Sequence, residues 1–177
     1  MRNGQIIPYN GITPQIDESV FICEGARIIG DVVIGKNSSI WFNAVVRGDV
    51  NYIRIGDNTN IQDGAILHNT FKKYPLIIGS NVTIGHGALV HGCNVSDFVL
   101  IGMGAVILDD ARIGSNSFIA AGTLVREHFV VPEGVLVAGV PSKIVRDLTE
   151  EEIKKIKQSA ENYLYYISVY RSTQDKK

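Results

Sequence analysis

Residues 16–46 read IDESVFICEGARIIGDVVIGKNSSIWFNAVV, and in this stretch a branched apolar residue returns at every sixth position. Neither the helical period of 3.6 residues nor the strand alternation of 2 produces a steady interval of six. A hexapeptide repeat predicts a parallel β-helix, in which each hexad forms one short side and its branched residue points inward. The inward positions are Ile16, Ile22, Ile28, Ile34, Ile40, Val46, Ile55, Ile61, Leu67, Ile78, Ile84, Val90, Ile101, Ile107, Ile113, Ile119, Val125, Val131 and Val137.

Branched apolar residues also dominate the composition. The 177 residues include 24 Ile and 19 Val but only 9 Leu, and 39 of the 43 Ile and Val residues lie before Leu148. Because branched residues favour strands and resist helices, an all-helical protein is excluded. Three sides would make a coil of about 18 residues, and a single coil cannot bury its own Ile side chains. We therefore expect an all-β domain of stacked coils over residues 1–148.

Charge and cysteine content exclude several classes of partner. The net charge is −1, so no basic surface for nucleic acid is indicated. Cys23 and Cys93 show no metal-site or redox spacing and are interpreted as two free thiols. No apolar run reaches membrane length, and Met1–Gly11 lacks an apolar signal region. These features predict a cytoplasmic protein with no membrane partner.

The sequence changes character after Pro141. Thr149 followed by Glu152 fits a capping box at the start of a helix. An apolar stripe at helical spacing follows, made of Ile153, Ile156, Ala160, Tyr163, Leu164 and Ile167. We expect a C-terminal helix within residues 149–172 that packs along the β-helix, and a frayed tail over residues 173–177.

The six-residue spacing is interrupted twice. Val46 and Ile55 are nine residues apart, and Leu67 and Ile78 are eleven residues apart. We expect each excess to form a small loop at a corner of the coil. The larger loop should lie around residues 69–75.

The spacing also places two histidines in one column. Three sides after Leu67 comes Val90, so Val90 should stack on Leu67 in the next coil. His68 and His91 each follow those positions by one residue and should therefore lie one above the other. If the first excess is a loop, Arg47 lies beneath them in the same column.

A second column lies on the preceding side. The same counting places His86 above Asp63, with Gln62 beside Asp63 and Trp41 beneath Gln62. We interpret Trp41 as a residue that packs against another subunit. His128 lies outside both columns and is interpreted as an exposed corner residue.

The histidine columns predict a metal site shared between subunits. A catalytic zinc is expected to have three protein ligands, and one column supplies only His68 and His91. If this column faces the other column of a neighbouring molecule, His86 completes the ligand set and Arg47 meets Asp63. Such docking between two sides of a triangular prism closes as a ring of three. The alternative is that the three histidines are surface residues of the ladder.

The motifs at these positions resemble those of the γ-class carbonic anhydrase family, over roughly residues 10–170. They are Arg47-Gly48-Asp49, Asn60-Ile61-Gln62-Asp63, His68, Gly85-His86, His91-Gly92 and Gly139-Val140-Pro141-Ser142-Lys143. The resemblance implies a left-handed β-helix and a homotrimer with metal at the subunit interfaces.

The resemblance also implies roles for single residues. His68, His86 and His91 correspond to the metal ligands, with Zn²⁺ as the expected metal and Fe²⁺ or Co²⁺ as substitutes. Gln62 corresponds to a residue that hydrogen-bonds the metal-bound water or the substrate. Arg47 and Asp63 correspond to an ion pair between subunits, and Asp49 corresponds to a nearby structural carboxylate. Tyr163 or Asn162, on the helix, corresponds to the pocket wall.

The implied reaction is the reversible hydration of CO₂ to bicarbonate by a zinc-bound hydroxide. The resemblance implies an acidic proton shuttle shortly after Asp49 and in the loop after His68. In this sequence Val50 directly follows Asp49 and the loop over residues 69–75 contains no acid, so this shuttle is absent or is replaced by buffer, Asp49 or Tyr74. We therefore expect weak or buffer-dependent activity. Three other functions stay open: a hexapeptide acyltransferase, a metal-dependent hydrolase such as a thioesterase, and a non-catalytic trimer stabilised by metal.

Overall fold

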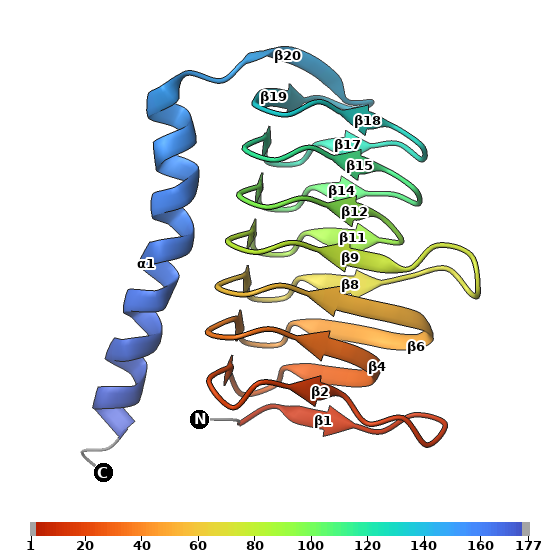
Figure 1. Cartoon of the computed structure of the whole chain (residues 1–177), viewed down its shortest axis with the longest axis vertical. Coiled ribbons are helices and arrows are strands. Elements are labelled where there is room, and N and C mark those ends of the chain that lie inside the picture. Colours follow the sequence, from red (N-terminus) through yellow and green to blue (C-terminus); the bar gives the residue numbers. More distant parts are fainter. Residues whose placement is uncertain (1–2, 175–177) are drawn as a thin grey trace.

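The computed structural model describes residues 3–174, as a parallel β-helix flanked by one long helix (Figure 1). The first face holds β1 (Gln5–Ile7), the start of β4 (Arg27–Ile34), the start of β6 (Val45–Ile55), β8 (Ile66–His68), β11 (Leu89–His91), β14 (Val106–Ile107) and β17 (Leu124–Val125). The second holds β2 (Gln15–Ile16), the ends of β4 and β6, β9 (Leu76–Ile78), β12 (Asn94–Val95), β15 (Arg112–Ile113) and β18 (Val130–Val131). The third holds β3 (Phe21–Ile22), β5 (Ser39–Ile40), β7 (Asn60–Ile61), β10 (Thr83–Ile84), β13 (Leu100–Ile101), β16 (Phe118–Ile119), β19 (Val135–Ala138) and β20 (Lys143–Asp147).

This arrangement confirms the predicted all-β parallel β-helix with a C-terminal helix. Strands β4 and β6 continue from the first face onto the second and join the two faces into a 12-stranded sheet. The third face is a separate 8-stranded sheet, and its last pair, β19 with β20, is antiparallel. Each residue of a column therefore lies next to its equivalent in the coils above and below.

The interior is formed by the inward residues of the six-residue spacing. Every predicted inward residue from Ile22 to Val137 is at most 4% exposed. Ile84, for example, is fully buried and pairs in the ladder with Ile61 on one side and Ile101 on the other. The next position, Gly85, has no room for a side chain, because a Cβ there would lie 2.6 Å from the backbone nitrogen of Met103 in the next coil. The stacked coils thus share one continuous apolar core.

The two interruptions take different forms. Residues 70–75 form the predicted loop, which protrudes between β8 and β9 (Figure 1). The prediction of a corner loop after Val46 is wrong, since β6 remains extended from Val45 to Ile55. Gly30 pairs with Gly48 and Val32 pairs with Ile53, so residues 49–52 form an enlarged bulge opposite Asp31. A bulge of this kind takes up the extra residues while the ladder shifts its register on either side.

The C-terminal helix α1 (Glu150–Gln174) packs along the third face, where Trp41 lies. Trp41 is 5% exposed, and its ring packs edge-on against Tyr163 and Tyr170 of α1. The interpretation of Trp41 as a subunit contact is therefore wrong. The six-residue count gives the side that a residue faces but not the element that covers it.

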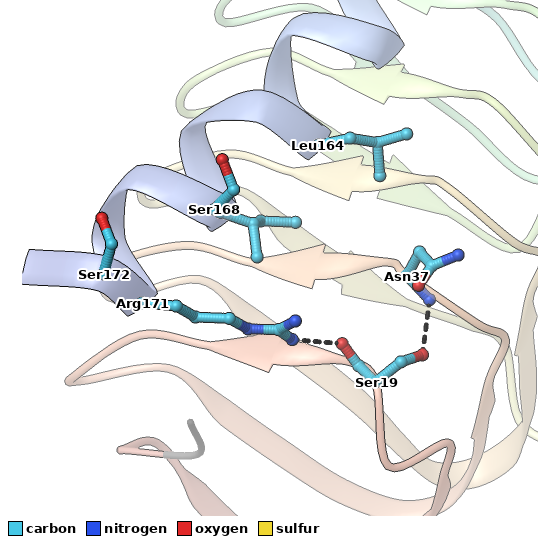
Figure 2. Close-up of a pocket in the computed structure, with 7 residues that line it drawn as sticks. Ser19, Asn37, Leu164, Ser168, Arg171 and Ser172 are labelled. Carbon is cyan, nitrogen blue, oxygen red and sulfur yellow. Dashed lines mark hydrogen bonds between the residues drawn. The ribbon is translucent and has the colours of Figure 1, made fainter. Parts of the chain in front are cut away.

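Both ends of α1 are fixed by polar contacts. The predicted capping box is present, because Thr149 Oγ1 accepts from the Glu152 amide and Glu152 Oε2 accepts from the Thr149 amide. At the other end, Arg171 Nη2 donates to the Ser19 carbonyl at 2.6 Å beside a groove (Figure 2). None of the predicted site residues lines this groove.

Three further observations concern the termini and the thiols. The helix includes residues 173 and 174 of the predicted tail, and residues 175–177 lie outside the described residues. Within residues 3–174, no helix is long and apolar enough to cross a membrane. Cys23 and Cys93 are buried free thiols, as predicted.

Candidate metal centre

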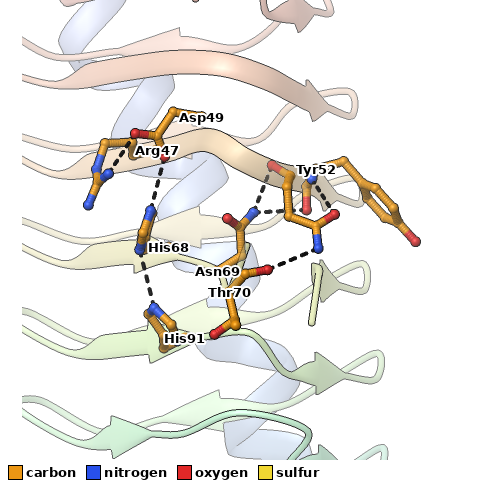
Figure 3. A network of polar contacts seen from close by, with 8 residues as sticks. Arg47, Asp49, Tyr52, His68, Asn69, Thr70 and His91 are labelled. Carbon is orange, nitrogen blue, oxygen red and sulfur yellow. Dashed lines mark hydrogen bonds and ion pairs between the residues drawn. The ribbon is translucent and has the colours of Figure 1, made fainter. Parts of the chain in front are cut away.

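His68 and His91 lie one above the other at the ends of adjacent strands β8 and β11. The ladder pairs Val90 with Leu67 and His91 with His68, which confirms the predicted column. His68 Nδ1 lies 3.2 Å from His91 Nε2, so the two rings turn a nitrogen toward each other (Figure 3). Both side chains are partly exposed on the outside of the first face.

A carboxylate contacts the outer nitrogen of each imidazole. Asp49 Oδ1 lies 3.0 Å from His68 Nε2, and Asp109 Oδ1 lies 2.6 Å from His91 Nδ1. Arg47 Nη1 donates to the other Asp49 oxygen at 2.7 Å (Figure 3). The polar contacts therefore run from Arg47 through Asp49, His68 and His91 to Asp109, across four successive coils.

The electrostatics of this chain favour a neutral His68. Burial opposes ionisation of Asp49, but hydrogen bonds from Arg47 and His68 outweigh it and hold its carboxyl pKa below the usual value. Burial lowers the pKa of His68, and the hydrogen bond to Asp49 offsets only part of this effect. At neutral pH, His68 therefore carries one ring proton, and the carboxylate of Asp49 attracts that proton to Nε2.

The paired imidazoles present two lone pairs to one point. If each neutral ring donates its outer N–H to its carboxylate, His68 Nδ1 and His91 Nε2 are both unprotonated. Two such lone pairs at 3.2 Å repel each other unless a cation lies between them. This donor pair is therefore incomplete without a shared proton or a metal ion.

His86 lies outside the column of His68 and His91, in the turn after β10 at the corner between the third and first faces, and forms a second polar cluster there. Its Nδ1 lies 2.8 Å from Asp63 Oδ2, and both side chains are nearly half exposed. The His86 amide donates to Gln62 Oε1 at 3.1 Å, and Gln62 Nε2 donates to Asn60 Oδ1. Gln62 is 6% exposed, so its orientation is fixed by these bonds.

One chain does not bring the two clusters together. Among residues 3–174, no group of three or more His, Cys, Asp or Glu side chains is placed to hold a metal ion. Arg47 contacts Asp49 rather than Asp63, and Asp63 contacts His86. Whether Arg47 and Asp63 meet across an interface stays a prediction.

Tyr163 lies on α1 near the second cluster. Its ring packs against Trp41 and Tyr166, and burial, together with the nearby charge of Asp63, raises its pKa to about 12. The phenol therefore stays protonated near neutral pH. His128, the remaining histidine, is exposed at a corner, as predicted, and contacts Asp110 at 3.1 Å.

Comparison with known proteins identifies the family. The bacterial transferase hexapeptide (six repeats) model matches residues 13–48 and 92–127. A carbonic anhydrase of Geobacillus kaustophilus is 45% identical over 172 residues, covering 97% of this chain and 94% of that protein. The chain belongs to the γ-class carbonic anhydrase-like family. Gamma carbonic anhydrase 2, mitochondrial, of Arabidopsis thaliana is 44% identical over 93% of this chain.

Members of this γ-carbonic anhydrase-like family differ in length and in the names they carry. The chain spans 61% and 56% of the two Arabidopsis relatives, gamma carbonic anhydrases 2 and 1. A crystal structure from Bacillus cereus, described as that of a candidate acetyltransferase, superposes with a TM-score of 0.93. That protein is 43% identical, and the match covers 97% of this chain and 99% of that one.

The donors of this γ-carbonic anhydrase-like chain fit a zinc ion. Two nitrogens that each lie about 2.0–2.1 Å from a tetrahedral zinc are about 3.3 Å apart, close to the separation of His68 Nδ1 and His91 Nε2. Neutral imidazoles with carboxylate partners are the usual form of zinc-binding histidines. One chain thus offers two converging ligands, and the ion needs at least one more.

Sequence reasoning missed Asp109. It lies in the coil that follows His91, where the ladder pairs Val90 with Ile107 and Asp109 therefore lies beside Gly92, from which its side chain reaches back to His91. The spacing alone does not point to Asp109, because the step from Val90 to Val95 is one residue short and shifts the register of this coil.

Proposed function

We propose that the protein is a metal-dependent carbonic anhydrase that interconverts CO₂ and bicarbonate. The observation that carries this proposal is the convergence of His68 Nδ1 and His91 Nε2, with a carboxylate behind each ring. The Geobacillus carbonic anhydrase, similar over nearly the whole of both chains, supports the reaction. The cytoplasmic location stays a prediction, since the Arabidopsis relatives are named as mitochondrial.

The proposed active form is a homotrimer with the metal between subunits. His68 and His91 of one subunit would meet His86 of the next, since His86 lies at a corner of the coil and away from the column of His68 and His91. A guanidinium has five N–H donors, so Arg47 can keep its bond to Asp49 and still bind a carboxylate of the neighbour. Asp63 of that neighbour, beside His86, is the proposed partner.

Each polar residue then has a defined task. When bound, zinc supplies a Lewis acid that lowers the pKa of a coordinated water to about 7. Asp49 holds His68, and Asp63 attracts the Nδ1 proton of His86 and leaves its Nε2 available. The Gln62 amide uses one N–H on Asn60, and the second N–H can orient an oxygen of the substrate. Iron or cobalt can take the place of zinc, because imidazole ligands discriminate weakly.

Proton release is expected to limit the rate. The loop over residues 69–75 carries lysines and no acid, and Val50 follows Asp49, so the product proton passes to buffer. We expect CO₂ hydration by zinc-loaded protein to rise with buffer concentration at constant pH and ionic strength. Elemental analysis with stopped-flow measurement tests both claims. About one metal per subunit with no hydration would reject the proposed reaction, and fast, buffer-independent turnover would reject the missing shuttle.

An acyltransferase is the second candidate, because the description of the Bacillus cereus structure names that activity. Hexapeptide acyltransferases need no metal, whereas the proposed hydration does. Acetyl transfer from acetyl-CoA that survives complete metal removal would favour this candidate. Loss of all turnover on chelation, with recovery on adding zinc, would favour the carbonic anhydrase.

A further inference from the structure

The geometry points to Asp109 and Thr70 as positioning residues that set the tautomer and orientation of His91 for metal binding. This inference rests on the proposed function and extends it to residues outside the family motifs quoted above. Asp109 lies on the coil above His91, and Thr70 lies on the protruding loop between β8 and β9. Neither is proposed to touch the metal, so both would act through His91.

Both oxygens of the Asp109 carboxylate are engaged. Oδ1 lies 2.6 Å from His91 Nδ1, and Oδ2 accepts a short hydrogen bond from Thr70 Oγ1. The Asp109 side chain is only 18% exposed, so water competes weakly for these bonds. A carboxylate held at both oxygens cannot rotate. It therefore fixes the proton of His91 on Nδ1 and leaves the lone pair of Nε2 directed at His68.

The backbone is shaped to admit this carboxylate. Gly92 directly follows His91 and has a φ of +48°, and a Cβ at this position would overlap Asp109 Oδ1. Any other residue would therefore clash with the carboxylate as well as adopt a strained left-handed conformation. Asp110, the next residue, takes no part in this arrangement and contacts the exposed His128 instead.

The Thr70 hydroxyl is held in place by the two segments that interrupt the repeat, the β6 bulge and the loop over residues 70–75. Asn51 of the β6 bulge donates its side-chain amide to the Thr70 carbonyl at 3.1 Å. Asn69 donates its side-chain amide to the carbonyls of Asn51 and Tyr52 (Figure 3). The Thr70 amide also donates to Tyr74 across the loop. The loop and the bulge thus support each other, and together they place a hydroxyl against Asp109.

The test measures zinc affinity rather than turnover. Asp109→Asn removes the charge behind His91 and should weaken zinc binding about 10–100-fold, the usual effect of losing such a partner. Thr70→Val removes the hydroxyl at constant shape and should weaken binding by a smaller factor. Thr70→Ser keeps the hydroxyl and should bind as wild type does. Asp110→Asn is the matched control and should leave the affinity unchanged.

Competition with a chromophoric chelator gives the zinc dissociation constants, and thermal melting of metal-free protein gives stability. Equal zinc affinities for Asp109→Asn and Asp110→Asn would overturn the inference. Equal losses for Thr70→Ser and Thr70→Val would remove Thr70 from it. Wild-type protein that binds no zinc would instead reject the proposed function itself. That result differs from one in which wild-type protein binds zinc and the variants bind it equally tightly.

Discussion

Replacing His91 by alanine is expected to abolish stoichiometric zinc binding and to lower the rate of CO₂ hydration by more than about 100-fold, the upper end of the loss expected when only the partner of a metal ligand is removed. His91 provides one of the two nitrogens that converge at 3.2 Å, and the ligand set cannot close without it. The same change removes the imidazole that contacts Asp109, so a small decrease in the free energy of unfolding should accompany it. Elemental analysis and stopped-flow hydration measure the two main effects.

His128→Ala is the matched control for this variant. His128 is also a surface histidine paired with an aspartate, Asp110, but it lies outside the proposed ligand set. Its removal should leave metal content and hydration at wild-type levels. Full metal content in the His91→Ala protein, with circular dichroism like that of wild type, would contradict the assigned ligand.

Replacing Ile84 by alanine is expected to lower the free energy of unfolding by about 2–5 kcal/mol. Ile84 is fully buried and stacks between Ile61 and Ile101, so truncation leaves a cavity that the flanking coils cannot fill. Ile84→Val should cost about 0.5–1.5 kcal/mol, because it removes a single methylene. Urea unfolding of metal-free protein, followed by circular dichroism, gives these differences.

Ile66→Ala separates burial from strand propensity. Ile66 also lies in a strand of the β-helix, but its side chain points outward and is 45% exposed. Its loss should therefore change the free energy of unfolding by much less than the loss of Ile84. Equal costs for the two alanine variants would mean that the inward column does not dominate stability.

The six-residue spacing predicted the fold because each inward position must face the same core in every coil. It therefore also predicted that His68 pairs with His91 and that His86 lies outside their column, although it did not predict that His86 lies in a corner turn. It could not predict β6 as one strand, since an excess of residues can be absorbed by a loop or by a bulge that shifts the ladder. The sequence alone does not distinguish these two solutions.

Contacts between side chains were the least predictable part of the site. Arg47 was expected to pair with Asp63 of another subunit, but within one chain its nearest carboxylate is that of Asp49, two residues away. The spacing places side chains in columns without choosing among the partners that a long side chain can reach. The hydrogen bond from Thr70 to Asp109 depends on the path of the loop over residues 70–75, which no repeat specifies.

The proposal that the metal is shared between subunits is tested most directly by mixing two inactive variants. His91→Ala keeps His86, and His86→Ala keeps His68 and His91, so a trimer containing both kinds of subunit can assemble complete sites. Random mixing at equal amounts should restore about one quarter of the wild-type metal content and hydration rate after joint refolding. Each variant refolded alone should have neither. A mixture as empty as its components would contradict a site built from two subunits.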